Sequence, residues 1–308
     1  MWLYIALLGF ACGAVVNILD KFILAQKKVL PSVFVFYSAI FLLPLLFVAP
    51  LVWPLSNLLA IGPILLTTSL GFLFGLYTMY RAELYSEVSH VAPLIGALIP
   101  LFILFFSRIF LNEVLQTHEY FGVALLVVGS LIISFEISRE HFGWHRGMLW
   151  AVVAAFSFAV FNVGSKVIYN EVGFTRGLVW VWGFMSVYAV LLLVFARPVR
   201  QAVFGKTKDS LPEVPKTSAA PMASAAWVVL NKFLALVSLI LVQYAVALGS
   251  VSIVNALAGV QYAFLIILVA WLSRYRPRVF AEKYGRGEKA QEAAAIIFII
   301  LGLALILK

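Results

Sequence analysis

Residues 82–96, AELYSEVSHVAPLIG, and residues 245–259, AVALGSVSIVNALAG, share a pattern at a constant shift of 163 positions. Both stretches fall where one predicted helix ends, the chain turns tightly and the next helix begins. Chance similarity between apolar segments explains an ordered set of Ala, Ser and Gly matches poorly. The pattern therefore predicts an internal repeat, with halves at 1–138 and 144–308. The matching pairs are Ala82/Ala245, Val88/Val251, Ser89/Ser252, Val91/Val254, Leu94/Leu257 and Gly96/Gly259.

The chain around these stretches is mostly hydrocarbon. Of its 308 residues 64% are hydrophobic and 11% are charged, and the mean hydropathy is +1.06. Ordinary soluble domains are about 45–50% apolar. A helix of about 20 apolar residues crosses the ~30 Å hydrocarbon layer. The sequence therefore predicts an all-α polytopic protein of the lipid bilayer, with ten transmembrane helices at 2–21, 31–53, 58–80, 88–111, 118–136, 147–169, 176–197, 225–248, 251–273 and 290–307.

Several classes of function are disfavoured by the composition. The net charge of +9 comes from Lys and Arg in the connections between apolar segments, so it does not indicate a nucleic-acid partner. The single cysteine, Cys12, allows no intrachain disulfide and no cysteine-based metal cluster. Motifs for nucleotide phosphates, dinucleotides, serine hydrolysis and zinc proteolysis are absent, so we expect no enzyme and no cofactor. Glu140, His141 and His145 are interpreted as an interfacial polar cluster rather than a metal site.

A polar pair also recurs in the two halves. Asn17 and Lys21 lie four residues apart near the end of the first segment, and Asn162 and Lys166 repeat this spacing in the sixth. Residues i and i+4 share one face of a helix. Five segments per half would invert the second copy in the membrane, which places the two lysines at opposite membrane faces. Inverted repeats are typical of secondary transporters that bind substrate between the halves.

Ionisable residues at membrane depth are further candidates for the substrate pathway. Lys232, inside the eighth segment, fits a functional role and an interfacial anchor equally well. His90 suggests a proton site, although a hydrogen-bonded structural histidine is favoured. Arg81 clusters with two glutamates, either as a gate or as a solvated helix end.

Uncharged polar residues and prolines complete the predicted pathway. Tyr and Gln offer hydrogen bonds without fixed charge, and a proline frees a backbone carbonyl that a substrate can use. For each of them the alternatives are an interfacial aromatic belt or a contact between helices. These candidates are Tyr77, Pro93, Pro100, Gln243, Tyr244, Asn255, Gln261 and Tyr262.

The sequence resembles the drug/metabolite transporter superfamily, in particular its EamA-type members. The resemblance rests on Asn17 with Lys21, on the hairpin from Ala82 to Pro100, on the acidic Leu111-Asn112-Glu113 and on the glycine pattern of the fifth segment. The second half departs from this pattern. Alanines align with Pro93 and Pro100, and the loop 274–289 is longer and more basic than its counterpart in the first half.

The resemblance implies a secondary transporter of small polar or amphipathic metabolites, amino acids among them, working by alternating access and most plausibly exporting. It also implies a multi-pass protein of a prokaryotic inner membrane, with a site lined by helices 1, 3, 4, 6, 8 and 9. A nucleotide-sugar or lipid-linked-sugar carrier and a non-transporting membrane scaffold remain alternatives. The scarcity of deep carboxylates argues weakly against tight proton coupling, which stays open together with the oligomeric state.

The distribution of positive charge predicts an orientation. Connections on one side of the predicted helices hold 17 Lys and Arg, and those on the other side hold 4. Positive loops favour the cytoplasm, so the count places both termini outside it. The family resemblance implies the reverse, and the sequence favours the charge count.

Overall fold

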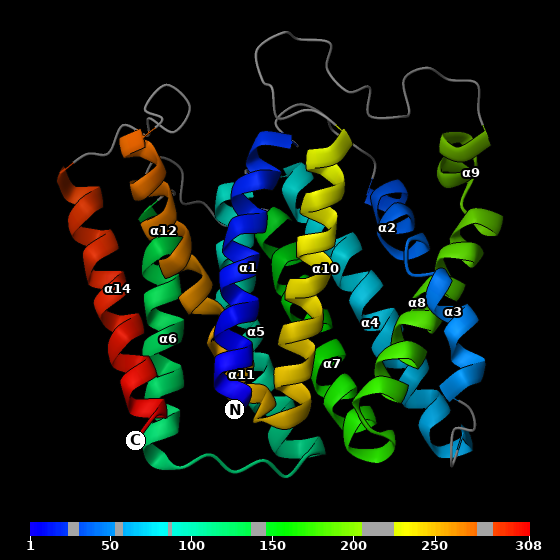
Figure 1. The fold of residues 1–308 in the computed structure, drawn as a ribbon, viewed down its shortest axis with the longest axis horizontal. Helices are drawn as coiled ribbons and strands as arrows, with labels where there is room; N and C mark the ends of the chain where they lie inside the picture. Colours follow the sequence, from blue (N-terminus) through cyan, green and yellow to red (C-terminus); the bar gives the residue numbers. More distant parts are fainter. Residues whose placement is uncertain (24–30, 53–57, 86–87, 137–145, 205–224, 276–285) are drawn as a thin grey trace, which may run out of the picture.

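The computed structural model describes residues 1–23, 31–52, 58–85, 88–136, 146–204, 225–275 and 286–308, and these residues form helices joined by short connections, with no strand among them (Figure 1). The predicted all-α fold is confirmed for this part of the chain. Its elements are α1 (Trp2–Ile23), α2 (Pro31–Ile40), α3 (Pro44–Val48), η1 (Ala49–Val52), α4 (Leu58–Tyr85), α5 (Val88–Phe110), α6 (Thr117–Glu136), α7 (Arg146–Val172), α8 (Phe174–Phe195), α9 (Arg197–Phe204), α10 (Ala225–Leu248), α11 (Val251–Ala256), α12 (Ala258–Tyr275) and α14 (Arg286–Ile306).

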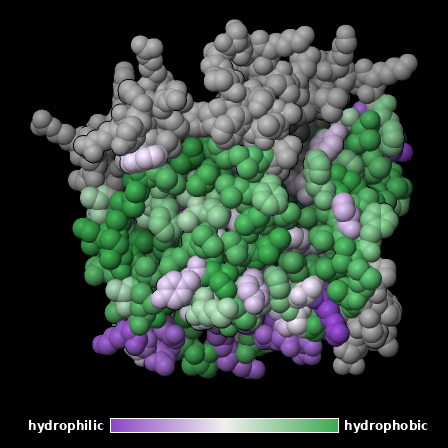
Figure 2. Space-filling model, in the orientation of Figure 1, coloured by the Kyte–Doolittle hydropathy of each residue, from purple (hydrophilic) through white to green (hydrophobic). Residues whose placement is uncertain are grey.

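The lengths and hydropathies of the helices fit a multi-pass membrane protein. Among the described residues six stretches are long and apolar enough to cross a bilayer, and four shorter apolar helices accompany them. An apolar surface covers most of the face seen in Figure 2, and polar residues gather along its lower edge. The number of ten crossings and the inverted relation of the two halves stay predictions.

Two of the predicted segments are interrupted. Pro44 has no backbone N–H and would clash with the carbonyl of Ile40, so α2 ends there. The N–H groups of Leu42 and Leu43 instead bond three residues back, in a turn that leads into α3. The ninth segment breaks at Leu257, between α11 and α12. The connection predicted between the seventh and eighth segments begins with a helix, because α9 covers Arg197–Phe204, and residues 205–224 lie outside the described part.

Helices of the first half of the sequence pack mainly against helices of the second half. In the first half α1 packs against α10 of the second, and α7 of the second half packs against α4 of the first. The pair α6 and α14 joins the last helix of each half. Both termini lie at one end of the bundle, the lower end in Figure 1. The helices therefore form a single interlocked body rather than two adjacent bundles.

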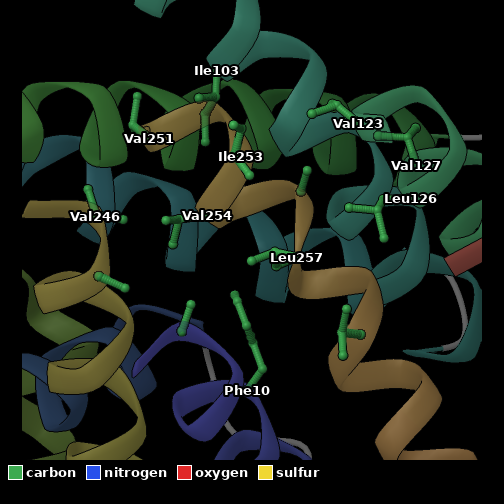
Figure 3. Packing of buried hydrophobic residues seen from close by; sticks show 14 of the residues in the cluster. Phe10, Ile103, Val123, Leu126, Val127, Val246, Val251, Ile253, Val254 and Leu257 are labelled. Atoms are coloured by element: carbon green, nitrogen blue, oxygen red, sulfur yellow. The ribbon is translucent and has the colours of Figure 1, made fainter. Parts of the chain in front are cut away.

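The core lies where helices of both halves meet. Phe10 of α1, Ile103 of α5 and Leu126 of α6 converge on Val254 and Leu257 around the break between α11 and α12 (Figure 3). The seam between α4 and α7 is tighter. A Cβ on Gly164 would collide with the Thr68 hydroxyl, so glycine at this position permits the two backbones to approach closely.

Candidate functional site

A buried polar cluster links α7 to α10 near the end of the bundle where both termini lie. Gln243 is 1% exposed; its side-chain oxygen accepts a hydrogen bond from the Tyr169 hydroxyl at 3.1 Å. Its amide nitrogen donates to Oδ1 of Asn162 at 3.4 Å, and the Asn162 amide donates to the backbone carbonyl of Phe158 at 2.9 Å. Buried polar groups of this kind are costly unless they are paired. We call Asn162, Lys166, Tyr169 and Gln243 the terminal-side cluster.

Lys166 belongs to the same face of α7 and ties it to the last turn of α10. Its ammonium group donates to the carbonyl oxygen of Ala247 at 2.8 Å. This carbonyl is one of the last of its helix, where backbone acceptors lack a partner within the helix and favour a cation. Glu113, in the connection after α5, interacts electrostatically with Lys166. The cluster thus extends from the second half to a carboxylate of the first.

That carboxylate is anchored across the two halves by hydroxyl groups. The Ser252 hydroxyl donates to Oε2 of Glu113 at 2.6 Å and lies 2.8 Å from the Ser107 hydroxyl. Ser252 is the second residue of α11, whereas Ser107 and Glu113 belong to the first half. A short bond to a charged acceptor is among the stronger hydrogen bonds in proteins. At the end of the bundle near the termini, polar contacts therefore link elements that are remote in sequence.

Asn17 and Lys21, which the predicted repeat pairs with Asn162 and Lys166, have a different environment. Asn17 is exposed, whereas Asn162 is only 8% exposed. Lys21 lies in the last turn of α1, and its side chain is outside the described residues. Over the described residues no packing comparable to that of α7 and α10 joins α1 to α4.

Two polar residues of α12 lie deeper in the bundle, each against a glycine. A Cβ on Gly13 of α1 would come within 2.9 Å of the Gln261 side-chain oxygen. A Cβ on Gly96 of α5 would lie 2.6 Å from the Tyr262 hydroxyl. Both side chains are half-buried. The glycines therefore make room for polar groups where helices of both halves meet, and a central substrate site at these groups stays a prediction.

Arg81 lies near the end of α4 among aromatic rings. The carbon of its guanidinium group is 5.3 Å from the ring centre of Trp150 on α7, 5.9 Å from Tyr77 and 5.8 Å from Tyr85. These distances allow favourable cation–π contacts. Its Nε atom is buried and has no hydrogen-bond partner among the described residues.

The remaining predicted residues have other surroundings. Pro100 is buried in α5, and Tyr244 packs its ring 4.9 Å from that of Phe174. The Asn255 amide donates to Val251 within its own helix at 2.9 Å. For His90, Pro93 and Lys232 the structure describes the helical backbone alone.

The sequence analysis did not single out Tyr169 or Trp150. Tyr169 follows Asn162 by seven residues and Lys166 by three, so helical spacing already placed it on their face. No sequence signal pairs Trp150 with Arg81, because that contact depends on which helices are neighbours. No group of three His, Cys, Asp or Glu residues within the described part could hold a metal ion. The polar loop at Glu140, His141 and His145 lies outside that part.

Comparison with known proteins relates the first part of the chain to a family. Residues 1–135 match the model of the EamA-like transporter family, whose members are membrane transporters of the drug/metabolite transporter superfamily. No curated protein matches the chain in sequence. A solved protein, described only as "Crystal structure of protein", is similar with a TM-score of 0.64 at 17% identity, over 98% of each chain. This last similarity shows a common fold over almost the whole chain.

Proposed function

Because residues 1–135 belong to the EamA-like transporter family, we propose that the protein is a secondary transporter that moves small polar or amphipathic metabolites by alternating access. The two halves, 1–138 and 144–308, rock about a site between them, related to each other as inverted repeats across ten membrane-crossing helices. Amino acids are the first substrates to test, and export is the expected direction.

The exchanged packing of the helices supports this mechanism. If α1 corresponds to α7 and α4 corresponds to α10, then the contact of α1 with α10 and that of α7 with α4 are the same contact seen twice. An inverted repeat requires such duplicate contacts, since each half must meet the other in the same way. Two equivalent seams provide surfaces on which the halves can move in opposite senses at the two membrane faces.

The difference in exposure between Asn17 and Asn162 is the observation that most supports alternating access. The cluster around Asn162 closes the terminal side, whereas the equivalent Asn17 is exposed. In a transporter with one closed and one open end, residues at matching positions of the two repeats would have different environments. In the opposite state Asn17 would be covered and the terminal-side cluster would open.

The distribution of Lys and Arg between the connections supports an orientation of the protein in its membrane. The termini would lie outside the cytoplasm of a prokaryotic cell whose inner membrane holds the protein, with the exposed Asn17 toward the cytoplasm. A metabolite would then enter from the cytoplasm and leave past the terminal-side cluster. A reporter fused to the C-terminus, active on one side of the membrane only, tests this orientation.

Transport itself is tested by counterflow in liposomes. The reconstituted protein is loaded with an unlabelled metabolite, and uptake of the labelled form is measured for a panel that starts with amino acids. We expect accumulation of at least one solute, abolished in liposomes without protein. Folded protein that moves no member of the panel would count against the transporter, and uptake that needs an imposed pH gradient would establish proton coupling.

A further inference from the structure

An arginine whose buried Nε donor has no hydrogen-bond partner among the described residues lies at the seam between the halves. Arg81 is contributed by α4 of the first half, and Trp150, the nearest of its three rings, by α7 of the second. The buried Nε donor of Arg81 has no hydrogen-bond partner, and no ion pair is found for its guanidinium within the described residues. The group is charged at every physiological pH because it does not deprotonate in proteins.

The aromatic rings compensate the positive charge of Arg81 only in part. Aromatic faces attract a cation by about 0.5–2 kcal/mol, but they accept no N–H hydrogen bond of ordinary strength and carry no net charge. Burying part of a cation with an unpaired donor costs more free energy than these cation–π contacts contribute. In other proteins an Arg in apolar surroundings is paired with an acid or a bound oxyanion.

We propose that Arg81, with Tyr77, Tyr85 and Trp150, forms a binding site for the oxyanion group of a ligand whose flat apolar part lies against the rings. A carboxylate would take the Nε edge of the guanidinium in a two-point contact, which a neutral amide cannot match. Tyr85, 46% exposed at the end of α4, is the ring that turns aside to admit it.

This site deepens the proposed transport function, on which it rests for its biological meaning, because it narrows the substrate to an organic anion. Its position across α4 and α7 means that rocking of the halves changes the distance between Arg81 and Trp150. A ligand held by both would be gripped in one state and released in the other. The same oxyanion chemistry is carried by lipid phosphates, so the source of the ligand has to be separated experimentally.

The test uses the full-length protein in nanodiscs of zwitterionic phosphatidylcholine, with benzoate as the probe and its neutral analogue benzamide as the comparison. Calorimetry should show benzoate binding and no benzamide binding. Arg81→Gln should weaken benzoate binding about tenfold or more, since a hydrogen bond to a charged group is lost. Arg81→Lys should fall between the two, because the charge remains and the planar fork is gone.

Arg108 provides the matched control. It is an exposed arginine of α5, so Arg108→Gln removes the same charge, and benzoate affinity should stay unchanged. Equal weakening by both substitutions would overturn the site, as would wild-type protein that binds neither benzoate nor anionic lipid. Thermal unfolding of each variant confirms that the compared proteins are folded.

A second arm identifies the source of the oxyanion. In nanodiscs with added phosphatidylglycerol, a lipid ligand would displace benzoate and would be enriched around wild-type protein but not around Arg81→Gln. Unchanged benzoate binding assigns the site to a soluble anion. Failure of this site leaves counterflow of some other solute intact, whereas failure of transport leaves benzoate binding intact, so the two proposals fail separately.

Discussion

Asn17 and Asn162, which the predicted repeat makes equivalent, lie in opposite environments. Asn162 is buried and joined through Gln243 to Tyr169, whereas Asn17 is exposed. The difference follows from the helices that flank them. The pair α7 and α10 is in contact, and no comparable packing joins α1 to α4. An identical side chain thus serves as part of a closed contact at one end and as an accessible amide at the other.

The two ends of the bundle thus differ in the hydrogen bonds that their described residues make. The halves are joined by packing between α4 and α7 and between α1 and α10. The terminal side adds a set of polar contacts on Lys166, Gln243 and Ser252. Each such bond contributes only about 0.5–1.5 kcal/mol net, so under the proposed mechanism this end would open without unfolding of the bundle.

The largest effect is expected at the seam that both ends share. In Gly164→Ala the added methyl group meets the Thr68 hydroxyl, and overpacking of this kind costs about 1–3 kcal/mol. The variant should unfold at a lower temperature in detergent and lose counterflow. Gly62→Ala in α4 is the control, because no described atom lies within 4 Å of its added Cβ. Equal unfolding midpoints for the two variants would contradict a tight seam.

Opening of the closed end should follow from Gln243→Leu. The Tyr169 hydroxyl and the Asn162 oxygen lose their partner, which costs about 1–3 kcal/mol and shifts the closed-to-open ratio roughly 5- to 150-fold. A thiol placed by Ser165→Cys, a position 0% exposed, in a Cys12→Ser background reports this change. An impermeant maleimide should label it faster from the terminal side.

The exposed Gln116 supplies the control for this labelling experiment. Gln116→Leu removes the same amide from the surface connection after α5 and should leave the rate of labelling unchanged. If Gln243→Leu labels no faster than this control, the cluster does not hold the end closed.

A smaller effect is expected from Ser252→Ala, which removes the hydroxyl that links Glu113 to Ser107 across the halves. The loss of about 1 kcal/mol corresponds to a roughly fivefold increase in the same labelling rate. Thr67→Ala is matched to it, since the Thr67 hydroxyl bonds only to carbonyls of its own helix. An identical rate in both variants would remove Ser252 from the closing contacts.

The smallest effect is expected at Asn17. Substitution of an exposed side chain usually changes stability by no more than about 0.5 kcal/mol. Asn17→Ala should therefore unfold at the wild-type midpoint, whereas Asn162→Ala should unfold earlier because Gln243 loses its acceptor. Comparable losses of stability in the two variants would mean that both ends are closed, and the asymmetry described above would be wrong.

Hydropathy alone was sufficient for most of the helices. The predicted segment at 225–248 coincides with α10, and that at 88–111 extends one residue beyond α5. The break at Pro44 could have been read from proline chemistry, yet 31–53 was predicted as one helix. The break at Leu257 could not, because no Gly or Pro occupies that position. It depends on packing in the core, where Leu257 is fully buried.

The site was predictable in its residue types but not in its contacts. Burial cost and repeat position singled out Asn162, Lys166 and Gln243. Their meeting depends on α7 lying beside α10, a long-range arrangement that no local pattern encodes. The Ala247 carbonyl that receives Lys166 is a backbone group, and any residue type at that position would offer it. The partner of the half-buried Lys166 therefore cannot be predicted from composition or spacing.

The packing of helices from one half against helices of the other affects the order in which contacts can form during synthesis. The partner of α1 is α10, and 225 residues separate the end of the one from the end of the other. At a synthesis rate of about 5–20 residues per second, α1 waits roughly 10–45 s before its neighbour exists. During that interval its polar Asn17 and its close-packing Gly9 and Gly13 face lipid or the insertion machinery. The first helix to be inserted is thus among the last to reach its final surroundings.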